Sequence, residues 1–337
     1  MLGIDLGGTK TEAALLDGAG RELWRRRVPT PAGDYEATIR AVASLAAAAR
    51  AAAPDAEFTI GIGTPGTLAA DGLMKNCNST CLNGRPLQRD LERALGRRIA
   101  LANDANCLAL SEATDGAGAG AAVVFAAILG TGVGAGIAVH GRVLGGANRI
   151  AGEWGHNPLP WLGDDEPRPG CYCGQRGCVE TLVSGSGLAR DHAFVNGESM
   201  AGEEIVRRAA AGNAACTATL ERHADRLARA LAAVVNLLDP DVIVLGGGLS
   251  RLPHLYERIP ARWANWIFSG GHRDTVRTRL VPALHGDASG VRGAAWLGRA
   301  AAVATAAAGC AADPLVDSTT TTAEDPAADR TVGRCDR

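Results

Sequence analysis

A short pattern of strand, glycine turn and strand occurs twice in this chain, and it limits the possible folds more than any other feature. The first copy covers residues 2–28 and turns at Gly7–Lys10, and the second covers residues 123–145 and turns at Gly130–Gly136. The copies lie roughly 125 residues apart, a spacing far longer than that of solenoid repeats. We therefore predict a duplicated α/β fold whose two halves enclose a cleft.

The rest of each half alternates between helix and strand patterns. Residues 35–53 and 217–238 have the apolar spacing of amphipathic helices, and a last helix is expected over residues 291–297. Residues 116–139 carry no charge, which is typical of a membrane span. Because glycines interrupt the middle of this run, it instead predicts two short buried strands around a turn.

A chain of 337 residues more naturally forms two domains than one. We expect an N-terminal domain over residues 1–115 and a C-terminal domain over residues 116–287, with a helix near residues 288–298 rejoining the first domain. From residue 299 the chain is rich in Ala, Thr, Asp and Pro. This composition favours a disordered tail over residues 299–337.

The charge and cysteine content indicate which partners to expect. A formal net charge of -2 provides no basic surface for nucleic acid or for an anionic membrane, so small molecules are the expected partners. No charged and apolar leader precedes Asp5, so we expect a cytoplasmic protein. Nine cysteines is an odd number for such a chain, which argues against a disulfide framework.

One imidazole and three thiolates between residues 153 and 180 form the ligand set that tetrahedral zinc prefers. These ligands are His156, Cys171, Cys173 and Cys178. The alternative is a loop in which the four residues are reduced and bind no metal. Glu153 and Glu180 flank the set, and carboxylates have no obvious place in a thiolate site. We therefore predict that they face a second ligand.

Neither glycine turn matches a standard nucleotide-binding motif. After Gly8 the chain has Thr9 where a P-loop requires Lys, and Lys10 comes one place later. The turn from Gly130 fits the relaxed dinucleotide pattern, but a β-prone run follows it where that motif requires a helix. Each turn alone is typical of a plain hairpin. Their matching positions favour phosphate binding through backbone N–H groups that no side chain covers.

Two acidic residues lie at strand positions that suit ligand binding. Asp5 lies on a short apolar strand, where a charge needs a partner such as a cation with phosphate. Asp104 follows Asn103 where a strand ends and a helix begins, and is either the N-cap of that helix or a general base in phosphoryl transfer. Together with Asn103, Glu153 and Glu180 it offers hydrogen-bonding groups that suit a polyhydroxylated ligand.

In combination these segments resemble the ROK family of sugar kinases, from residue 2 to about residue 298. The matching segments, in family order, are Asp5-Leu-Gly-Gly-Thr-Lys10, Asn103-Asp104, Gly130-Thr-Gly-Val-Gly134, Glu153-x-Gly-His156, Cys171-x-Cys-Gly-x-x-Gly-Cys-x-Glu180 and Gly246-Gly-Gly248. The resemblance implies the duplicated actin-like ATPase fold of hexokinases, which is ribonuclease H-like, with two domains around a cleft. It also implies ATP-dependent phosphorylation of a sugar, and a homodimer.

The resemblance further implies roles for individual residues. The implied nucleotide-binding residues are Asp5, Gly7, Gly8, Thr9, Lys10, Gly130, Thr131, Gly132, Gly134, Gly246, Gly247, Gly248 and Leu249. The implied sugar-binding residues are Gly66, Asn78, Asn103, Asp104, Glu153, His156 and Glu180. Asp104 is the implied catalytic base. Structural Zn²⁺ is implied on His156, Cys171, Cys173 and Cys178, while Mg²⁺ accompanies ATP.

Residues 75–80, 82–84 and 153–161 most resemble bacterial fructokinases of the manno(fructo)kinase type. This resemblance implies that D-fructose is converted to fructose 6-phosphate, with mannose and glucose as further substrates. The alternatives are an N-acetylglucosamine or N-acetylmannosamine kinase and a glucokinase. Cys81 stands where relatives often have Trp, which puts the packing beside the sugar in doubt.

Two readings outside catalysis are disfavoured. A sugar-responsive transcription repressor of the same family would place a helix-turn-helix ahead of the first strand, which begins here at residue 2. A catalytically inactive sugar-binding protein would not need Asp104 and both glycine turns.

Overall fold

The computed structural model describes residues 1–268 and 275–310. The first half contains the strands β1 (Leu2–Leu6), β2 (Lys10–Leu16), β3 (Glu22–Pro29), β4 (Ile60–Thr64) and β7 (Ala100–Asn103), and a small hairpin of β5 (Thr67–Leu68) and β6 (Met74–Lys75). The second half contains β8 (Val123–Leu129), β9 (Val133–Val139), β10 (Arg142–Val143), β11 (Val242–Gly246) and β12 (Arg279–Pro282).

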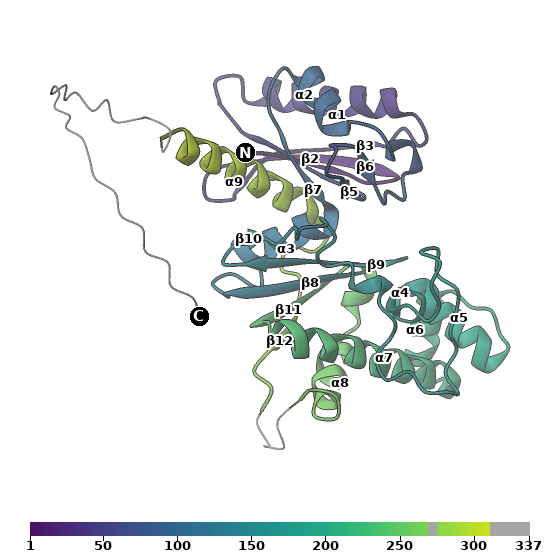
Figure 1. Cartoon of the computed structure of the whole chain (residues 1–337). Helices are drawn as coiled ribbons and strands as arrows, with labels where there is room; N and C mark the ends of the chain where they lie inside the picture. Colours follow the sequence, from purple (N-terminus) through teal and green to yellow (C-terminus); the bar gives the residue numbers. More distant parts are fainter. Residues whose placement is uncertain (269–274, 311–337) are drawn as a thin grey trace, which may run out of the picture.

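The two large sheets have the same topology. Their strand orders are β3-β2-β1-β4-β7 and β10-β9-β8-β11-β12. In each sheet an antiparallel hairpin, β1 with β2 or β8 with β9, is continued by two parallel strands. Figure 1 shows one sheet in each half of the molecule. The predicted duplicated α/β fold is confirmed, and residues 123–139 of the uncharged run form the β8–β9 hairpin.

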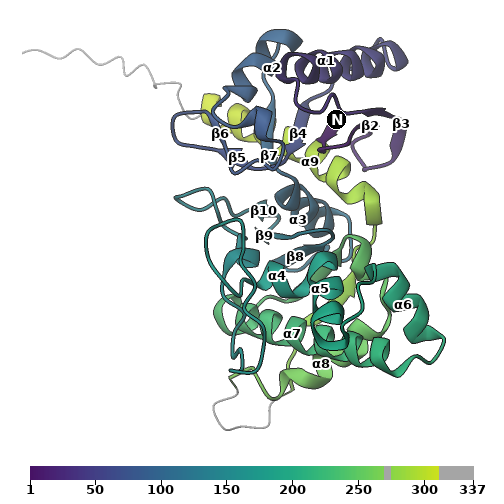
Figure 2. The ribbon, with the colours of Figure 1, turned by 90° about the vertical axis from the view of Figure 1, so that its right-hand side faces the viewer.

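Helices cover the outer face of each sheet. The first half carries α1 (Tyr35–Ala52), α2 (Leu87–Leu95) and the 3-10 helix η1 (Thr80–Leu82). The second half carries η2 (Trp154–His156), α4 (Val179–Val183), α5 (Gly185–Asn196), α6 (Gly202–Ala210), α7 (Ala214–Leu238), η3 (Gly248–Arg251), α8 (His254–Trp263) and η4 (Gly286–Ala288). Two further helices, α3 (Asp104–Thr114) and α9 (Ser289–Cys310), lie where the halves meet (Figure 2).

The helix starts follow from local sequence. Helix α1 begins after Asp34, whose side chain accepts a hydrogen bond from the N–H of Ala37. Helix α7 begins after Asn213, whose side chain accepts from the N–H of Cys216. The buried residues of α1 are Tyr35, Thr38, Ile39, Val42, Leu45, Ala46 and Ala49. Because they recur every three or four positions, α1 has one apolar face, which packs on the first sheet.

The central helices bring the backbones of the two halves together. Helix α9 contacts β1 and β4 of the first sheet, α3 contacts β8 and β9 of the second, and the two helices contact each other. At Gly293 a Cβ atom would overlap the carbonyl oxygen of Cys107 on α3. Glycine therefore permits this close approach, which a side chain would prevent.

The end of the chain differs from the expectation. Helix α9 runs from Ser289 to Cys310, so the expected helix over residues 291–297 is too short, and a disordered tail from residue 299 is wrong for residues 299–310. Alanine, the strongest helix former, makes up most of this stretch, and its propensity outweighs the low complexity. The rest of the tail, residues 311–337, lies outside the described residues. The domain boundaries stay a prediction.

Among the helices of the described part, none is both long and apolar enough to cross a membrane.

Candidate active site

Residues from both halves line a pocket of about 240 Å³. It contains all seven expected sugar-binding residues and four expected phosphate-binding residues: Gly66, Asn78, Asn103, Asp104, Glu153, His156, Glu180, Gly130, Thr131, Gly132 and Gly134. These residues come from the ends of strands and from loops, which is where α/β sheets bind ligands. Their individual roles stay a prediction.

Asp104 is the first residue of α3, directly after β7. The N-cap of this helix is Asn103, whose Oδ1 accepts a hydrogen bond from the N–H of Ala105 at 2.9 Å. Asp104 is therefore not the N-cap, although its own Oδ1 accepts from the same N–H at 2.8 Å. Burial raises the pKa of Asp104 above its ordinary value, and the nearby carboxylate of Glu153 raises it further. A carboxylate with a raised pKa suits a general base near neutral pH.

Glu180 joins the metal loop to the second glycine turn. It lies in the first turn of α4, and its Oε2 accepts a hydrogen bond from the N–H of Val133 at 2.9 Å. A Cβ atom at Gly132 would lie 2.7 Å from the same oxygen, so a side chain there would displace the carboxylate. Cys178 precedes Glu180 by only two residues, so the short segment between them connects the metal cluster to Glu180. The hydrogen bond from Val133 connects Glu180 to the glycine turn.

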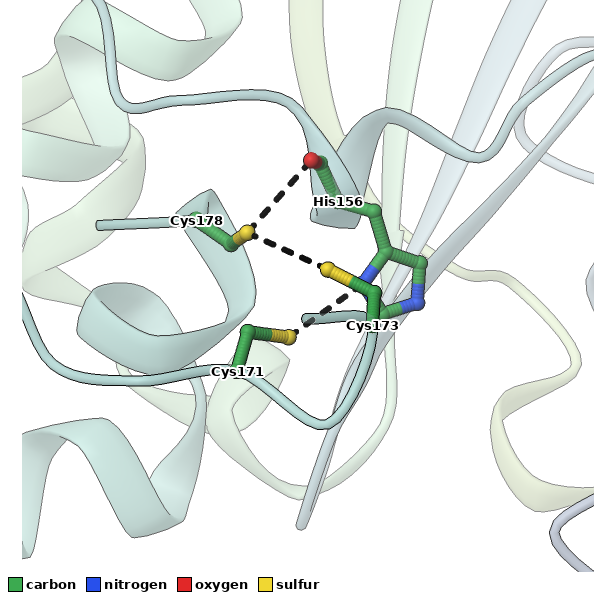
Figure 3. Close-up of side chains that lie close together, drawn as sticks. All are labelled: His156, Cys171, Cys173 and Cys178. Carbon is green, nitrogen blue, oxygen red and sulfur yellow. Dashed lines mark hydrogen bonds between the residues drawn. The ribbon is translucent and has the colours of Figure 1, made fainter. Parts of the chain in front are cut away.

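The four expected zinc ligands lie together, and their ligand atoms are all within 4.8 Å of one another (Figure 3). The Sγ atoms of Cys173 and Cys178 are 3.6 Å apart, and Sγ of Cys171 lies 3.5 Å from Nδ1 of His156. Tetrahedral ligands at ordinary zinc distances are about 3.5–3.8 Å apart. The cluster therefore fits a zinc ion bound by three thiolates and by Nδ1 of the imidazole.

The first glycine turn lies in a neighbouring pocket of about 440 Å³. Gly7, Gly8 and Thr9 line it, and a hydrogen bond of 3.0 Å from the N–H of Gly7 to the carbonyl of Lys10 closes the turn. Asn78 lines both pockets. Cys81, the departure from the family pattern, also lines this second pocket, along with Thr30 and Ser79. The two glycine turns therefore occupy adjoining pockets rather than one.

Asp5 lies on β1, and a Cβ atom at Gly290 would come within 2.9 Å of its Oδ2. Burial raises the pKa of Asp5 to about 7, with further contributions from Asp104 and Glu12, while the charge of Lys10 opposes the rise. A carboxyl group in this position is stabilised in its charged form by a cation. The interaction of Asp5 with a cation stays a prediction.

The third glycine segment lies beside the second turn. Gly246 ends β11 and pairs with Ile128, two residues before Gly130. Gly247 has a φ of 82°, which favours glycine, and a Cβ atom there would come within 2.5 Å of the carbonyl oxygen of Leu129. Residues 246–249 are not among those that line the two pockets.

The pocket also contains residues that the sequence did not single out, among them Asn76, Val133 and Tyr172. Asn76 has a φ of 59°, a conformation that Asn tolerates better than most residues. Tyr172 lies between two expected metal ligands in the sequence. This was the one sequence feature that could have indicated its position in the pocket.

Two curated relatives illustrate what the chain is similar to. The N-acetyl-D-glucosamine kinase of Yersinia enterocolitica serotype O:8 / biotype 1B (strain NCTC 13174 / 8081) is 39% identical over 301 residues, which cover 88% of this chain and 98% of the relative. The enzyme of the same name from Vibrio vulnificus (strain YJ016) is 38% identical over 305 residues, covering 88% of this chain and 98% of the relative. These relatives bear the name of one of the alternatives, not of a fructokinase.

Among solved structures, the ROK hexokinase from Thermus thermophilus has a TM-score of 0.78 and 33% identity, and the match covers 90% of this chain and 99% of that one. A ROK family glucokinase from Streptomyces griseus, in complex with glucose and AMPPNP, has a TM-score of 0.71 and 28% identity, with coverage of 89% and 99%. Residues 1–301 match the ROK family as a whole. The chain therefore belongs to the ROK family.

Proposed function

We propose that the protein transfers the γ-phosphoryl group of ATP to the 6-hydroxyl group of a hexose. The observation that carries the proposal is the position of Asp104, which lies in one pocket with Glu153, Glu180 and the second glycine turn. The relatives named kinases and the glucokinase complexed with glucose and AMPPNP support the same reaction and both substrates.

In this reaction Asp104 accepts the proton of the sugar hydroxyl group as its oxygen attacks the γ-phosphorus atom of ATP. The remaining polar residues of the pocket hold the other hydroxyl groups: Asn78, Asn103, Glu153, His156 and Glu180. Backbone N–H groups of the two glycine turns, together with Lys10, stabilise the negative charge on the phosphate oxygens.

Two metal ions belong to the proposal. The Mg²⁺ ion that accompanies ATP would neutralise phosphate charge when bound, and we assign Asp5, a buried carboxyl group with a raised pKa, as the carboxylate that interacts with it. Zinc on the cluster of His156, Cys171, Cys173 and Cys178 supplies a rigid framework for the loop, since all four ligand positions are taken by protein.

The identity of the preferred sugar is the more specific part of the proposal. The curated relatives favour N-acetyl-D-glucosamine, whereas the residues after His156, Asn-Pro-Leu-Pro-Trp161, favour D-fructose through their resemblance to fructokinases. Both sugars offer a 6-hydroxyl group to Asp104, so the base and the phosphate turns serve either substrate equally.

A coupled assay of ADP release tests the proposal. The panel consists of fructose, mannose, glucose, N-acetylglucosamine and N-acetylmannosamine, each with ATP and Mg²⁺. We expect ADP release that depends on at least one of these sugars, and the highest kcat/KM identifies the substrate. ADP release that no sugar stimulates would overturn the kinase assignment.

A further inference from the structure

The strongest feature that the proposed reaction leaves unused is the side chain of Tyr172. Its hydroxyl group lies 2.9 Å from Nε2 of His156. The two rings meet edge to face, with centroids 5.0 Å apart and an interplanar angle of 83°. Tyr172 also lines the pocket together with Asp104, Glu153 and Glu180. One aromatic side chain therefore contacts both the metal cluster and the candidate sugar site.

The orientation of His156 determines whether the Tyr172 hydroxyl group acts as a hydrogen-bond donor or acceptor. Nδ1 lies 3.5 Å from Sγ of Cys171 and belongs to the metal cluster. Nε2 is therefore the ring nitrogen that can interact with groups in the pocket. A metal on Nδ1 leaves the proton of the neutral ring on Nε2, which donates to Oη of Tyr172 in the sugar-free protein and is available to a sugar hydroxyl group when sugar binds. The O–H of Tyr172 remains free to donate to a further acceptor in the pocket.

The side chain of Tyr172 also lies at the solvent-exposed side of the pocket. Tyr172 is 83% exposed, and within residues 1–268 and 275–310 its hydroxyl group has no hydrogen-bond partner other than His156. The pocket, at about 240 Å³, is smaller than the usual range for small-molecule sites, which begins near about 300 Å³. The tyrosine ring therefore forms part of the boundary of a small pocket.

We propose that Tyr172 is a sugar-positioning and specificity residue: its hydroxyl group orients His156 and donates a hydrogen bond to the bound sugar, and its ring disfavours hexoses that carry a bulky N-acetyl group. The proposal rests on the proposed function, because it assumes that this pocket binds the sugar. It predicts that the pocket prefers a hexose without that substituent.

Two variants separate the tasks of the hydroxyl group and the ring. Tyr172→Phe removes only the hydroxyl group, and Tyr172→Gly removes the ring as well. Tyr35→Phe is a matched control, because it deletes a tyrosine hydroxyl group that is bound to Asp90 in the other half of the molecule. Each protein is titrated with fructose, glucose and N-acetylglucosamine by calorimetry without ATP, and is then assayed for KM and kcat. Zinc content and Tm are measured on the same samples.

We expect Tyr172→Phe to weaken binding of the preferred unsubstituted hexose about fivefold to tenfold, as the loss of one hydrogen bond implies, while the KM for ATP stays within twofold of the wild type. We expect Tyr172→Gly to raise the ratio of kcat/KM for N-acetylglucosamine to that for fructose at least tenfold. Zinc content stays equal in all four proteins, and the control retains the sugar affinity of the wild type.

Wild-type sugar affinity in Tyr172→Phe, together with an unchanged sugar ratio in Tyr172→Gly, would overturn the proposal. Loss of zinc from Tyr172→Phe would also overturn it, because the residue would then support the metal loop alone. Failure of the proposed function is visible separately, as absence of sugar-dependent ADP release from the wild type. In that case, calorimetric comparison of sugar affinity between the wild type and the Tyr172 variants still tests the role of Tyr172. A wild type that binds no sugar overturns both proposals.

Discussion

Asp5 and Asp104 have the same side chain in different surroundings, and their contacts indicate different roles. Asp104 faces the pocket with Glu153, while Asp5 lies within the first sheet beside Gly290 and the charge of Lys10. Both have a raised pKa because burial disfavours the charged form. Asp5 therefore needs a cation when it is ionised, whereas Asp104 needs a proton donor such as a sugar hydroxyl group.

Asp5 makes the stability of the ligand-free protein depend on pH. Its folded pKa of about 7 lies above the ordinary value of 3.8, so the folded state holds this proton more tightly than the unfolded state. The contribution of Asp5 to stability is therefore greatest below pH 3.8 and is lost as pH rises toward 7. Asp5→Asn removes this loss. At pH 8 we expect the variant to be more stable than the wild type, by no more than about 4 kcal/mol.

Urea unfolding at pH 8, 6.5 and 5, without ATP or Mg²⁺, measures the effect. The stability difference between Asp5→Asn and the wild type should shrink steadily as pH falls. A difference that is constant across this range would contradict the raised pKa.

Cys178 is the buried member of the metal cluster, and it lies two residues before Glu180. We expect one zinc ion per chain in protein purified without chelator, and we expect Cys178→Ser to lose it. Because Glu180 and the loop lose their anchor, the KM for the sugar should rise at least tenfold. Cys216→Ser, at a buried cysteine outside the cluster, is the control. Elemental analysis measures the zinc content of each protein. Full zinc occupancy in Cys178→Ser would contradict the assigned ligand set.

At this scale the sequence predicted residues that the structure brings together in one pocket, while their roles in binding stay a prediction. It left Asp104 as either the N-cap or the base, whereas the structure has Asn103 as the N-cap, and both side chains accept a hydrogen bond from the N–H of Ala105. It also missed Tyr172, because only the rotamer of an exposed side chain brings its hydroxyl group to His156.

Among the elements, α3 and α9 have the closest packing, and glycine makes it possible. A Cβ atom at Gly293 would overlap the carbonyl oxygen of Cys107, so the two helices would have to separate. We expect Gly293→Ala to lower the free energy of unfolding by about 1–3 kcal/mol, the usual cost of overpacking, despite the better helix propensity of Ala. Gly18→Ala, where an added Cβ meets nothing within 4 Å, is the control.

Chemical denaturation of the two glycine variants measures this difference. Equal stability of Gly293→Ala and the wild type would mean that the helices do not pack this closely.

The elements that the sequence predicted best are those with a clear period. The two glycine-turned hairpins and the amphipathic helices α1 and α7 depend on local patterns, and they form where expected. The end of α9 was wrong because alanine-rich sequence is compatible with both helix and disorder. Contact with the first sheet accounts for the start of this helix, and alanine propensity accounts for its extension.

On the scale of the whole molecule, the pocket exists only because both halves contribute to it. Gly66 and Asn78 come from the first half, and Glu153, His156 and Glu180 come from the second. The buried carboxylate of Glu112, at the end of α3, accepts hydrogen bonds from the N–H groups of Ala117 and Leu284 and from the hydroxyl group of Ser289. These bonds connect α3 to the start of α9, which leads back to the first sheet.

The repeated hairpins predicted the presence of a cleft, but they did not predict its size or which residues close it. Those depend on contacts between segments far apart in the chain, such as the hydrogen bond of 3.0 Å from Nζ of Lys75 to the carbonyl of Asn148. The sugar could not be predicted either, because the base and the phosphate turns serve any hexose with a 6-hydroxyl group. Assembly as a homodimer stays a prediction, which light scattering in solution can test.

The most direct test of the central claim is the turnover of Asp104→Asn with the best sugar of the panel, measured beside calorimetric binding of that sugar. Asparagine has nearly the same shape but cannot accept the proton of the hydroxyl group. We expect kcat to fall at least 100-fold, the usual contribution of a general base, while the sugar Kd changes less than tenfold. A variant that binds the sugar and retains near wild-type kcat would contradict the assignment of Asp104 as the base.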